Sequence, residues 1–318
     1  MQSMPKRAFL KLSVAAAATA ALAACGGGDD VVSTVNPLDI VGVAQSDPQF
    51  SILVEAVAAA GLVDTLKSAG PFTVFAPTNT AFAALLSELK VTKDQLLANK
   101  ALLTRVLTYH VLAGKVPAAS VPVGKTITTV ETGVFKIEST GGLKITDESN
   151  RASNITLTDV AASNGVIHVI DKVLLPSDKD IVAMAQSLAP EFSILVEAVV
   201  AANLVTTLQG PGPFTVFAPT NAAFAAALTE LGITKDALFA NKALLTKVLT
   251  YHVVGARVLK AEVPIGAPIT SVQGETFTID ASLKITDQRA RVAGISATDV
   301  FASNGVIHVI DKVILPKP

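Results

Sequence analysis

The sequence predicts two consecutive α+β domains that share one fold, and three observations support this prediction. Residues 162–173, with the sequence ASNGVIHVIDKV, return unchanged as residues 302–313. Each copy begins with segments of helical periodicity and ends with short strands rich in β-branched residues. The chain of 318 residues, half of them apolar, is long enough and apolar enough to form two hydrophobic cores.

Further matches extend the repeat over nearly the whole chain. Residues 98–111 return as residues 240–253 with a single substitution. A period near 140 residues suits a complete domain better than the unit of a solenoid. We therefore predict domain 1 at residues 38–176 and domain 2 at residues 178–316, joined by a linker of a few residues.

The first part of each copy predicts helices around one short strand. In domain 1, residues 52–60 place their apolar side chains on one helical face, and residues 72–75 form the strand. Thr78 is expected to cap the helix that follows the strand, and Thr92 and Asn99 begin two further helices.

From His110 onward the pattern changes to short strands separated by Gly and Pro. Strands are expected at residues 126–130, 134–138, 143–146, 155–160 and 166–173. Asn164-Gly165 predicts a tight turn, because both residues accept positive φ. The strand after it is apolar on both faces except for His168, which is typical of a strand buried between layers. We expect a mainly antiparallel pair of sheets with helices over one side.

Residues 1–24 have the organisation of an export signal. Positive charge at Lys6 and Arg7 precedes an apolar run that is too short for a membrane span of ~20 residues. Residues 22–25, Leu-Ala-Ala-Cys, resemble the lipobox of bacterial lipoproteins, in which the cysteine is lipidated. The alternative is a plain secretory signal. Because Cys25 is the single cysteine and lies at the cleavage point, we expect it to carry a lipid anchor.

Other features of this region concern the destination of the protein. Residues 6–11, KRAFLK, resemble a twin-arginine signal with Lys in place of the first Arg, which leaves the export route open. The residue after the cysteine is Gly26, which resembles the pattern in lipoproteins sent to an outer membrane. We therefore expect the protein at the bacterial cell envelope or cell surface. Residues 25–37 predict a flexible tether. Once Cys25 is lipidated, the folded part has no thiol for a disulfide.

Charge and motif content exclude several function classes. Lys6, Arg7 and Lys11 are three of the 25 basic residues, so the chain after the signal is mildly acidic and lacks a basic run, which argues against a nucleic-acid partner. The sequence contains no HExxH, CxxC or similar ligand spacing, and we expect no metal or cofactor. Ser163 and Ser303 precede histidines but have no nucleophile-elbow context, so no catalytic residue is predicted.

Three ordered motifs resemble the fasciclin-like (fasciclin I) domain family. Residues 72–82, FTVFAPTNTAF, resemble its first signature, and residues 164–171, NGVIHVID, resemble its second. Tyr109-His110 lies between them, where the family has a Tyr-His pair. Domain 2 has the same motifs at residues 214–224, at Tyr251-His252 and at residues 304–311.

The resemblance implies a wedge-shaped β-sandwich with a helical layer and a role in adhesion or binding outside the cell, generally without enzyme activity. In animal members, integrin recognition has been placed at the Tyr-His region and at an Asp-Ile pair before the second signature. The resemblance therefore implies candidate partner-binding residues, namely Tyr109, His110, Asp159, Val160, Tyr251, His252, Asp299 and Val300. No Arg-Gly-Asp occurs in the chain.

Two interpretations of the Tyr-His pairs remain open at this point. Tyr109 and Tyr251, the two tyrosines of the chain, recur at one site, so the site requires a tyrosine. The tyrosine can fill the edge of a core, or it can anchor a partner.

The second signature also carries titratable residues. His168 is either a metal ligand or base, or a buried imidazole bonded to neighbouring groups, and the second interpretation is preferred. Asp171, three residues on, projects to the opposite face of the strand and cannot share a metal with His168. We assign a structural role to Asn164, Gly165, His168, Asp171, Asn304, Gly305, His308 and Asp311.

The sequence thus favours a non-enzymatic surface protein that binds a protein or glycan through two tandem domains. The first alternative is a periplasmic or surface module that binds a small molecule or polysaccharide between sheet and helices. A more remote alternative is a hydrolase whose residues converge only in the fold. The oligomeric state, the angle between the domains and the identity of the partner stay open.

Overall fold

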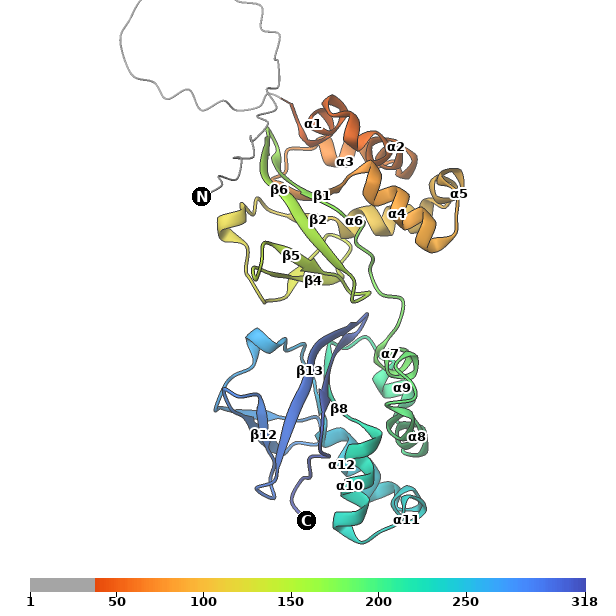
Figure 1. Ribbon diagram of the computed structural model, residues 1–318, viewed down its shortest axis with the longest axis vertical. Helices are drawn as coiled ribbons and strands as arrows, with labels where there is room; N and C mark the ends of the chain where they lie inside the picture. Colours follow the sequence, from red (N-terminus) through yellow and green to blue (C-terminus); the bar gives the residue numbers. More distant parts are fainter. Residues whose placement is uncertain (1–37) are drawn as a thin grey trace, which may run out of the picture. The chain divides into compact units, whose positions relative to one another are not determined.

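The computed structural model describes residues 38–318, and helices and strands of domain 1 follow the predicted order (Figure 1). Its helices are α1 (Ile40–Ser46), η1 (Pro48–Phe50), α2 (Ser51–Ala60), α3 (Val63–Lys67), α4 (Asn79–Leu89), α5 (Lys93–Ala98), α6 (Lys100–Tyr109) and η2 (Ala118–Ser120). Its strands are β1 (Phe72–Pro77), β2 (Val111–Ala113), β3 (Ile127–Thr128), β4 (Val134–Glu138), β5 (Lys144–Thr146), β6 (Ala152–Ala162) and β7 (Gly165–Ile170).

Domain 2 repeats this series of elements. Its helices are α7 (Ile181–Ser187), α8 (Ser193–Ala201), α9 (Val205–Leu208), α10 (Asn221–Leu231), α11 (Lys235–Ala240), α12 (Lys242–Tyr251) and η3 (Lys260–Glu262). Its strands are β8 (Phe214–Pro219), β9 (Val253–Val254), β10 (Pro268–Thr270), β11 (Thr276–Ile279), β12 (Lys284–Thr286), β13 (Val292–Ala302) and β14 (Gly305–Ile310).

The strands of each domain form one continuous sheet with the same order. In domain 1 the order is β2-β1-β7-β6-β5-β4-β3, and domain 2 has the corresponding order. The neighbours are antiparallel except β1 and β7, and β8 and β14, which run parallel. β7 therefore lies inside the sheet, between β1 and β6, and is buried along its whole length. The α+β class is confirmed, with one folded sheet in place of the expected pair.

The long strand β6 allows this sheet to fold back on itself. Two irregularities interrupt its register with β7, one after Ile155 and one after Leu157, and such irregularities bend a strand. As a result Phe75 of β1 and Phe135 of β4 meet edge to face, with ring centroids 5.2 Å apart, although three strands separate β1 from β4 in the sheet. The two halves of the sheet thus enclose a core, as in a β-sandwich.

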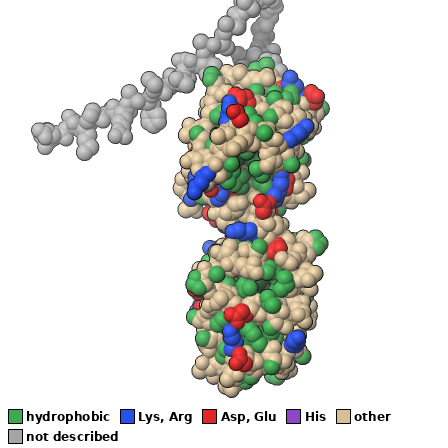
Figure 2. Space-filling view, turned by 90° about the vertical axis from the view of Figure 1, so that its right-hand side faces the viewer, with side chains coloured by type: hydrophobic (Ala, Val, Ile, Leu, Met, Phe, Trp, Pro, Cys, Tyr) green, Lys and Arg blue, Asp and Glu red, His purple; other side chains and the backbone are tan. Residues whose placement is uncertain are grey.

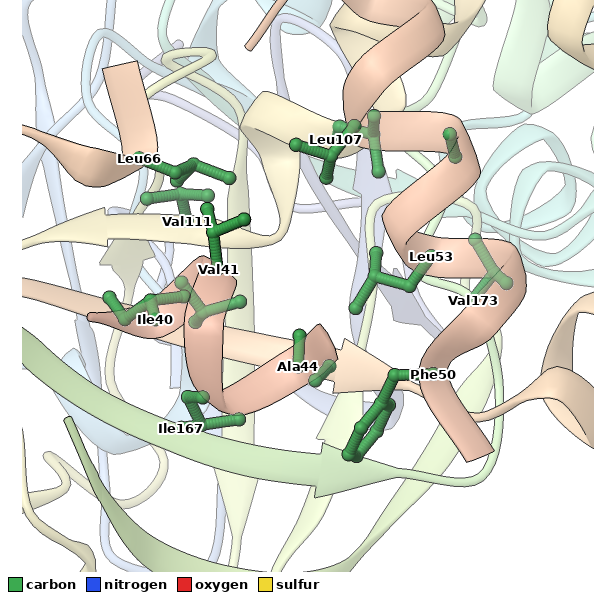
Figure 3. Packing of buried hydrophobic residues seen from close by; sticks show 14 of the residues in the cluster. Ile40, Val41, Ala44, Phe50, Leu53, Leu66, Leu107, Val111, Ile167 and Val173 are labelled. Atoms are coloured by element: carbon green, nitrogen blue, oxygen red, sulfur yellow. The ribbon is translucent and has the colours of Figure 1, made fainter. Parts of the chain in front are cut away.

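A second core lies between the sheet and the helices of domain 1. Figure 1 shows α1, α2, α4 and α5 gathered on one side of the strands. Ile40 and Val41 of α1, Leu53 of α2, Val111 of β2 and Ile167 of β7 belong to this buried cluster (Figure 3). The predicted apolar faces of the helices are the faces buried here.

Helix starts agree with the predicted caps. The Thr78 hydroxyl accepts a hydrogen bond from the N–H of Ala81 at 3.3 Å, at the start of α4. Thr92 begins α5 with a capping box that includes Gln95, and Asn99 caps α6. These short-range contacts depend on residues only a few positions apart, which is why the sequence alone predicts them.

The turn before β7 differs from the prediction. It consists of Ser163 and Asn164, and Gly165 is already the first residue of β7. Neither Asn164 nor Gly165 has a positive φ. Gly165 is required for another reason, since a Cβ there would lie 2.2 Å from the backbone oxygen of Phe72 on the neighbouring strand. Close approach of two strands, rather than left-handed backbone, explains the glycine.

The predicted export signal, the lipobox cysteine Cys25 and the tether lie outside the described residues. Within residues 38–318, no helix is both long enough and apolar enough to pass through a membrane.

Candidate functional site

Tyr109, at the end of α6, is completely buried. Its hydroxyl donates a hydrogen bond to the backbone oxygen of Val134 at 2.5 Å and accepts one from the N–H of Glu148 at 2.9 Å. Burial, followed by nearby carboxylates, raises the pKa of this hydroxyl well above its ordinary value. The protonated hydroxyl therefore joins helix α6 to β4 and to the loop after β5.

Tyr251 occupies the same place in domain 2 with fewer polar contacts. It is completely buried, and its hydroxyl donates to the backbone oxygen of Thr276 at 2.8 Å. Gln288, which replaces Glu148, bonds the same oxygen through its side-chain amide at 2.6 Å. Within the described residues, the hydroxyl of Tyr251 makes one hydrogen bond of ordinary geometry and a weaker contact with the backbone of Gln288, whereas that of Tyr109 makes two ordinary hydrogen bonds.

Replacing each tyrosine by phenylalanine tests this difference. We expect Tyr109→Phe to lower the free energy of unfolding by about 2 kcal/mol and Tyr251→Phe by about 1 kcal/mol, because the first variant leaves two buried groups unpaired. Denaturant titration of both variants measures the two losses. An equal or larger loss for Tyr251→Phe would contradict this account.

The histidine beside each tyrosine is buried and forms hydrogen bonds with two backbone groups through its two ring nitrogens. His110 donates from Nδ1 to the backbone oxygen of Val106 at 2.7 Å and accepts at Nε2 from the N–H of Leu174 at 2.9 Å. His252 makes the equivalent bonds at 2.8 and 3.1 Å. Burial lowers the pKa of both imidazoles to about 4, so both are neutral at neutral pH.

Acidification is expected to destabilise domain 2 more than domain 1. Histidine in an unfolded chain titrates near pH ~6.5. Because the folded pKa of His252 is about 4, the unfolded state binds more protons between these values. The stability that His252 contributes is complete above the unfolded pKa and is lost as pH falls toward 4, at about 1.4 kcal/mol per pH unit.

His110 adds the same slope in domain 1, but Asp147 opposes it. Burial raises the pKa of the Asp147 carboxyl to about 6, so the folded state holds a proton that the unfolded chain releases, and lower pH favours folding. Calorimetry at pH ~7 and ~5, which bracket the histidine window, should show the larger loss in the domain 2 transition. A domain 2 equally stable at both values would contradict the prediction.

The Tyr-His pairs are therefore interior groups. None of the four side chains is more than 2 % exposed: Tyr109, His110, Tyr251 and His252. A partner cannot contact them while the domain is folded, so the geometry supports packing, one of the two interpretations left open by the sequence. These residues can therefore affect partner binding only indirectly, by stabilising the exposed residues packed around them.

His168 uses both ring nitrogens within domain 1. Nε2 donates to the backbone oxygen of Val116 at 3.0 Å, and Nδ1 accepts from the N–H of Asp159 at 3.3 Å. The imidazole lies against the ring of Phe75, with centroids 5.4 Å apart. His308 repeats both hydrogen bonds at 2.9 and 3.2 Å. Neither histidine has a nitrogen free for a metal or a substrate, which supports the structural assignment.

Asp171 serves a separate contact just after β7. Its carboxylate accepts from the backbone N–H and the side-chain amide of Asn154, at 2.7 and 2.6 Å. In domain 2, Asp311 accepts from the N–H of Gly294 at 2.7 Å. Asp171 and His168 share no hydrogen-bond partner in the described part of the chain, and β7 ends at Ile170, three residues earlier than predicted.

Asn164 connects three segments of domain 1. Its side-chain oxygen accepts from the N–H of Ile40 at 3.0 Å, and its amide group donates to the backbone oxygens of Leu66 and Ser68 at 2.7 and 2.8 Å. Asn304 makes the same three bonds in domain 2 at 2.9, 2.8 and 2.8 Å. Each asparagine ties the first helix and the loop before the first strand to the β-hairpin. A Cβ added at Gly305 would lie 2.2 Å from the backbone oxygen of Phe214, which is the same close approach as at Gly165.

Asp159 and Asp299 are held in one geometry by their surroundings. Each has a φ of 60°, in the left-handed region, and each donates its N–H to a histidine of the neighbouring strand. One carboxylate oxygen of Asp159 accepts from the N–H of Ala118 at 2.9 Å, and that of Asp299 accepts from Lys260 at 2.7 Å. Both aspartates are therefore presented in preorganised positions, at register irregularities of the long strands β6 and β13.

The environments of the two aspartates differ. Asp159 is exposed, whereas Asp299 is only 6 % exposed, because its second carboxylate oxygen accepts a hydrogen bond at 2.8 Å from the ammonium of Lys136 in domain 1. Val160 and Val300 are half-buried and pack against the helix-side cores. Of the two predicted Asp-Val sites, the one in domain 1 has its carboxylate open to a partner.

Two surfaces meet at this contact. We call residues 115–120 and 159–161 the head of domain 1, and residues 257–262 and 299–301 the head of domain 2. The tails are residues 124–136 and 148–150 in domain 1, and residues 266–278 and 288–290 in domain 2. The tail of domain 1 covers the head of domain 2.

Polar groups pair across this interface. The side-chain amide of Asn150 bonds both the N–H and the C=O of Phe301, at 2.7 and 3.0 Å. The Arg257 guanidinium lies 3.5 Å from the carboxylate of Glu148, and burial lowers the pKa of Arg257. The N–H and C=O of Phe301 face away from β14, and a side chain of the other domain thereby bonds both groups.

An apolar cluster completes the interface. Val134 of domain 1 packs with three residues of domain 2, namely Leu259, Phe301 and Val306. Val134, Leu259, Phe301 and Lys136 follow no motif and were not predicted from the sequence. A signal was present, because the other copy has threonine, proline, alanine and threonine at these four positions.

Other sites in the described part of the chain are limited. Within residues 38–318, no three His, Cys, Asp or Glu side chains gather where they could hold a metal ion. The apolar cavity between the helices and sheet of domain 1 has a volume of about 60 Å³, and its counterpart in domain 2 about 30 Å³. Sites for drug-sized ligands usually measure about 300–1,000 Å³, so these cavities do not favour the small-molecule alternative. A hollow of about 370 Å³ lies between the linker and helices α4, α5 and α6.

Charged side chains form no extended patch of one sign on the face shown in Figure 2. Acidic and basic groups lie there in small mixed clusters between tan and green areas. This distribution agrees with the mildly acidic composition after the export signal.

Comparison with known proteins places these features in context. The family model described as Fasciclin domain matches residues 48–176 and 190–316. The chain is 46 % identical over 137 residues to the uncharacterized protein sll1735 of Synechocystis sp., covering 43 % of this chain and 97 % of that protein. It is 29 % identical over 253 residues to transforming growth factor-beta-induced protein ig-h3 of Sus scrofa, covering 79 % of this chain and 35 % of the relative.

Among solved structures, the FAS1 domain pair from the insect cell adhesion molecule fasciclin I matches 82 % of this chain and 95 % of that chain. The two are 16 % identical and superpose with a TM-score of 0.39.

Proposed function

Because the chain belongs to the fasciclin-domain family and carries two copies of that domain, we propose that it is a non-enzymatic binding protein that acts in adhesion at the cell envelope. Its partner is a surface protein or a glycan. Partner contact takes place at the head of domain 1, around Asp159 and Val160.

The exposed carboxylate of Asp159 carries this proposal. The bend of β6 that presents it is held by hydrogen bonds to His168 and Ala118, so little ordering is needed when a partner arrives. The equivalent carboxylate of Asp299 accepts a hydrogen bond from a lysine of a neighbouring domain, which supports a protein contact at this geometry. The buried Tyr-His pairs then support the domain beneath the contact.

Export and lipid anchoring belong to the same proposal. The export signal at residues 1–24 and the lipobox ending in Cys25 support a chain held at the membrane surface by acyl groups, with residues 25–37 as the tether. Growth with a clickable fatty acid should label the wild-type protein and leave Cys25→Ser unlabelled. A labelled Cys25→Ser protein, or an unlabelled wild type, would contradict the anchor.

Capture of partners from the native envelope tests the binding site. We expect wild type and the matched control Asp94→Asn, at another exposed aspartate, to capture the same partner. Asp159→Asn should weaken capture by at least about tenfold, which corresponds to about 1.4 kcal/mol. Equal capture by Asp159→Asn and Asp94→Asn would place the contact elsewhere.

A further inference from the structure

The head of domain 1 retains the polar groups with which the head of domain 2 holds a neighbouring domain. Asp159 corresponds to Asp299 and has the same φ and the same backbone hydrogen bond. Lys115 stands where domain 2 has Arg257, so the pattern of one negative and one positive charge is kept. Within residues 38–318, no hydrogen bond is made by the second carboxylate oxygen of Asp159, and Lys115 is exposed.

The backbone at Ala161 is the third retained group. It corresponds to Phe301, whose N–H and C=O are both bonded by the carboxamide of Asn150. Ala161 pairs with Val166 in the same register as Phe301 with Val306, so its N–H and C=O face the same outer edge of the sheet. A carboxamide could therefore bond Ala161 in the same way.

The apolar part of the head is smaller in domain 1. Phe301 and Leu259 are replaced by Ala161 and Pro117. An occupant therefore has to supply more apolar bulk than Val134 supplies at the head of domain 2. The retained polar groups specify the orientation of the occupant, and the small residues leave it space.

The tail of domain 2 in a second copy does not match this surface. Where the tail of domain 1 has Val134, Lys136 and Asn150, the tail of domain 2 has threonine, threonine and alanine at positions 276, 278 and 290. It lacks both the ammonium and the carboxamide. The tail of domain 1 in a second copy is already engaged with its own domain 2.

We propose that the head of domain 1 binds the tail of a fasciclin-like domain in another protein, which presents a lysine to Asp159 and a carboxamide to the backbone of Ala161. This rests on the proposed function and names the chemistry of the partner. The interface between the two domains of this chain serves as the template, and charge complementarity at Asp159 supplies orientation.

The full chain itself provides the probe. The variant T276L/T278K/A290N gives the tail of domain 2 the lysine and carboxamide of the domain 1 tail, and a leucine bulkier than Val134 at position 276. Gln288 is kept because it bonds the backbone oxygen of Thr276, which the variant retains. We expect this chain to associate head to tail, with an apparent dissociation constant at least about tenfold lower than that of wild type in sedimentation experiments. Adding Asp159→Asn should reverse the gain.

Two arms keep the test decisive. Circular dichroism and thermal unfolding verify the fold of the variant, and T278K/A290N replaces it if the change at Thr276 disturbs the core. A folded variant that stays monomeric, a gain that survives Asp159→Asn, or wild type associating as strongly as the variant would overturn the proposal. Envelope capture distinguishes the two claims: loss of capture in Asp159→Asn without association of the variant would sustain the binding site and reject this partner chemistry.

Discussion

Replacing Asn164 by alanine is expected to lower the free energy of unfolding of domain 1 by about 3 kcal/mol, and its melting temperature by roughly 10 °C. The variant leaves the N–H of Ile40 and the C=O of Leu66 without their partner inside the protein. A third group, the C=O of Ser68, lies nearer to solvent and contributes less. Calorimetry that resolves the transitions of the two domains measures the loss.

Two further variants separate the hydrogen bonds from other effects of the change. Ser163→Ala removes a hydroxyl group at the neighbouring exposed position and should cost little. Asn164→Asp keeps the acceptor for Ile40 but turns both donors into acceptors that face carbonyl oxygens, so it should be at least as harmful as alanine. If Asn164→Ala behaves like Ser163→Ala, the asparagine does not hold the hairpin to the first helix.

Local and periodic features of the fold could be predicted from the sequence. Thr78, Thr92 and Asn99 cap helices through contacts with residues that follow closely in the chain. The two copies of ASNGVIHVIDKV indicated a buried strand, and β7 and β14 are such strands. The apolar helix faces and the change to strands after His110 also agree with the structure, because periodicity records which side of an element is buried.

Contacts between distant segments could not be predicted in this way. Asn164-Gly165 signals a turn in any chain, but here Gly165 is required by the backbone of Phe72, some ninety positions earlier. The burial of Tyr109 depends on Val134 and Glu148, which reach it only when the sheet folds back. A single pattern along the chain carries no information about such partners.

The interface between the two domains could have been predicted in part from the sequence. The residues that domain 1 contributes to it, Val134, Lys136 and Asn150, follow no motif, so they were not identified as candidates. A comparison of the two copies at each position would have shown that Val134, Lys136 and Asn150 change together in domain 2. The two copies share many core residues, and a difference at a contact position therefore carries information about a different neighbour.

Lys136→Met is expected to separate the two domains or to cost about 3 kcal/mol of stability. The ammonium is bonded to Asp299 and Glu138, both at 2.8 Å. Burial alone would lower the pKa of Lys136, but the bonds to the two carboxylates outweigh it and raise the pKa, so the lysine stays charged. Without it, the Asp299 carboxylate, with a side chain only 3 % exposed, loses its cationic partner in a buried place.

Lys144→Met supplies the matched control, because Lys144 is an exposed lysine of the same sheet and should be replaceable at little cost. Small-angle scattering should show a larger radius of gyration for Lys136→Met if the interface opens, and denaturant titration should show the loss if it stays closed. The double variant Lys136→Met/Asp299→Leu removes both charges and should recover most of the loss, since a paired buried charge and an apolar pair are often close in free energy. If Lys136→Met matches Lys144→Met in both measurements, the ion pair does not hold the domains together, and the template for partner binding at Asp159 loses its basis.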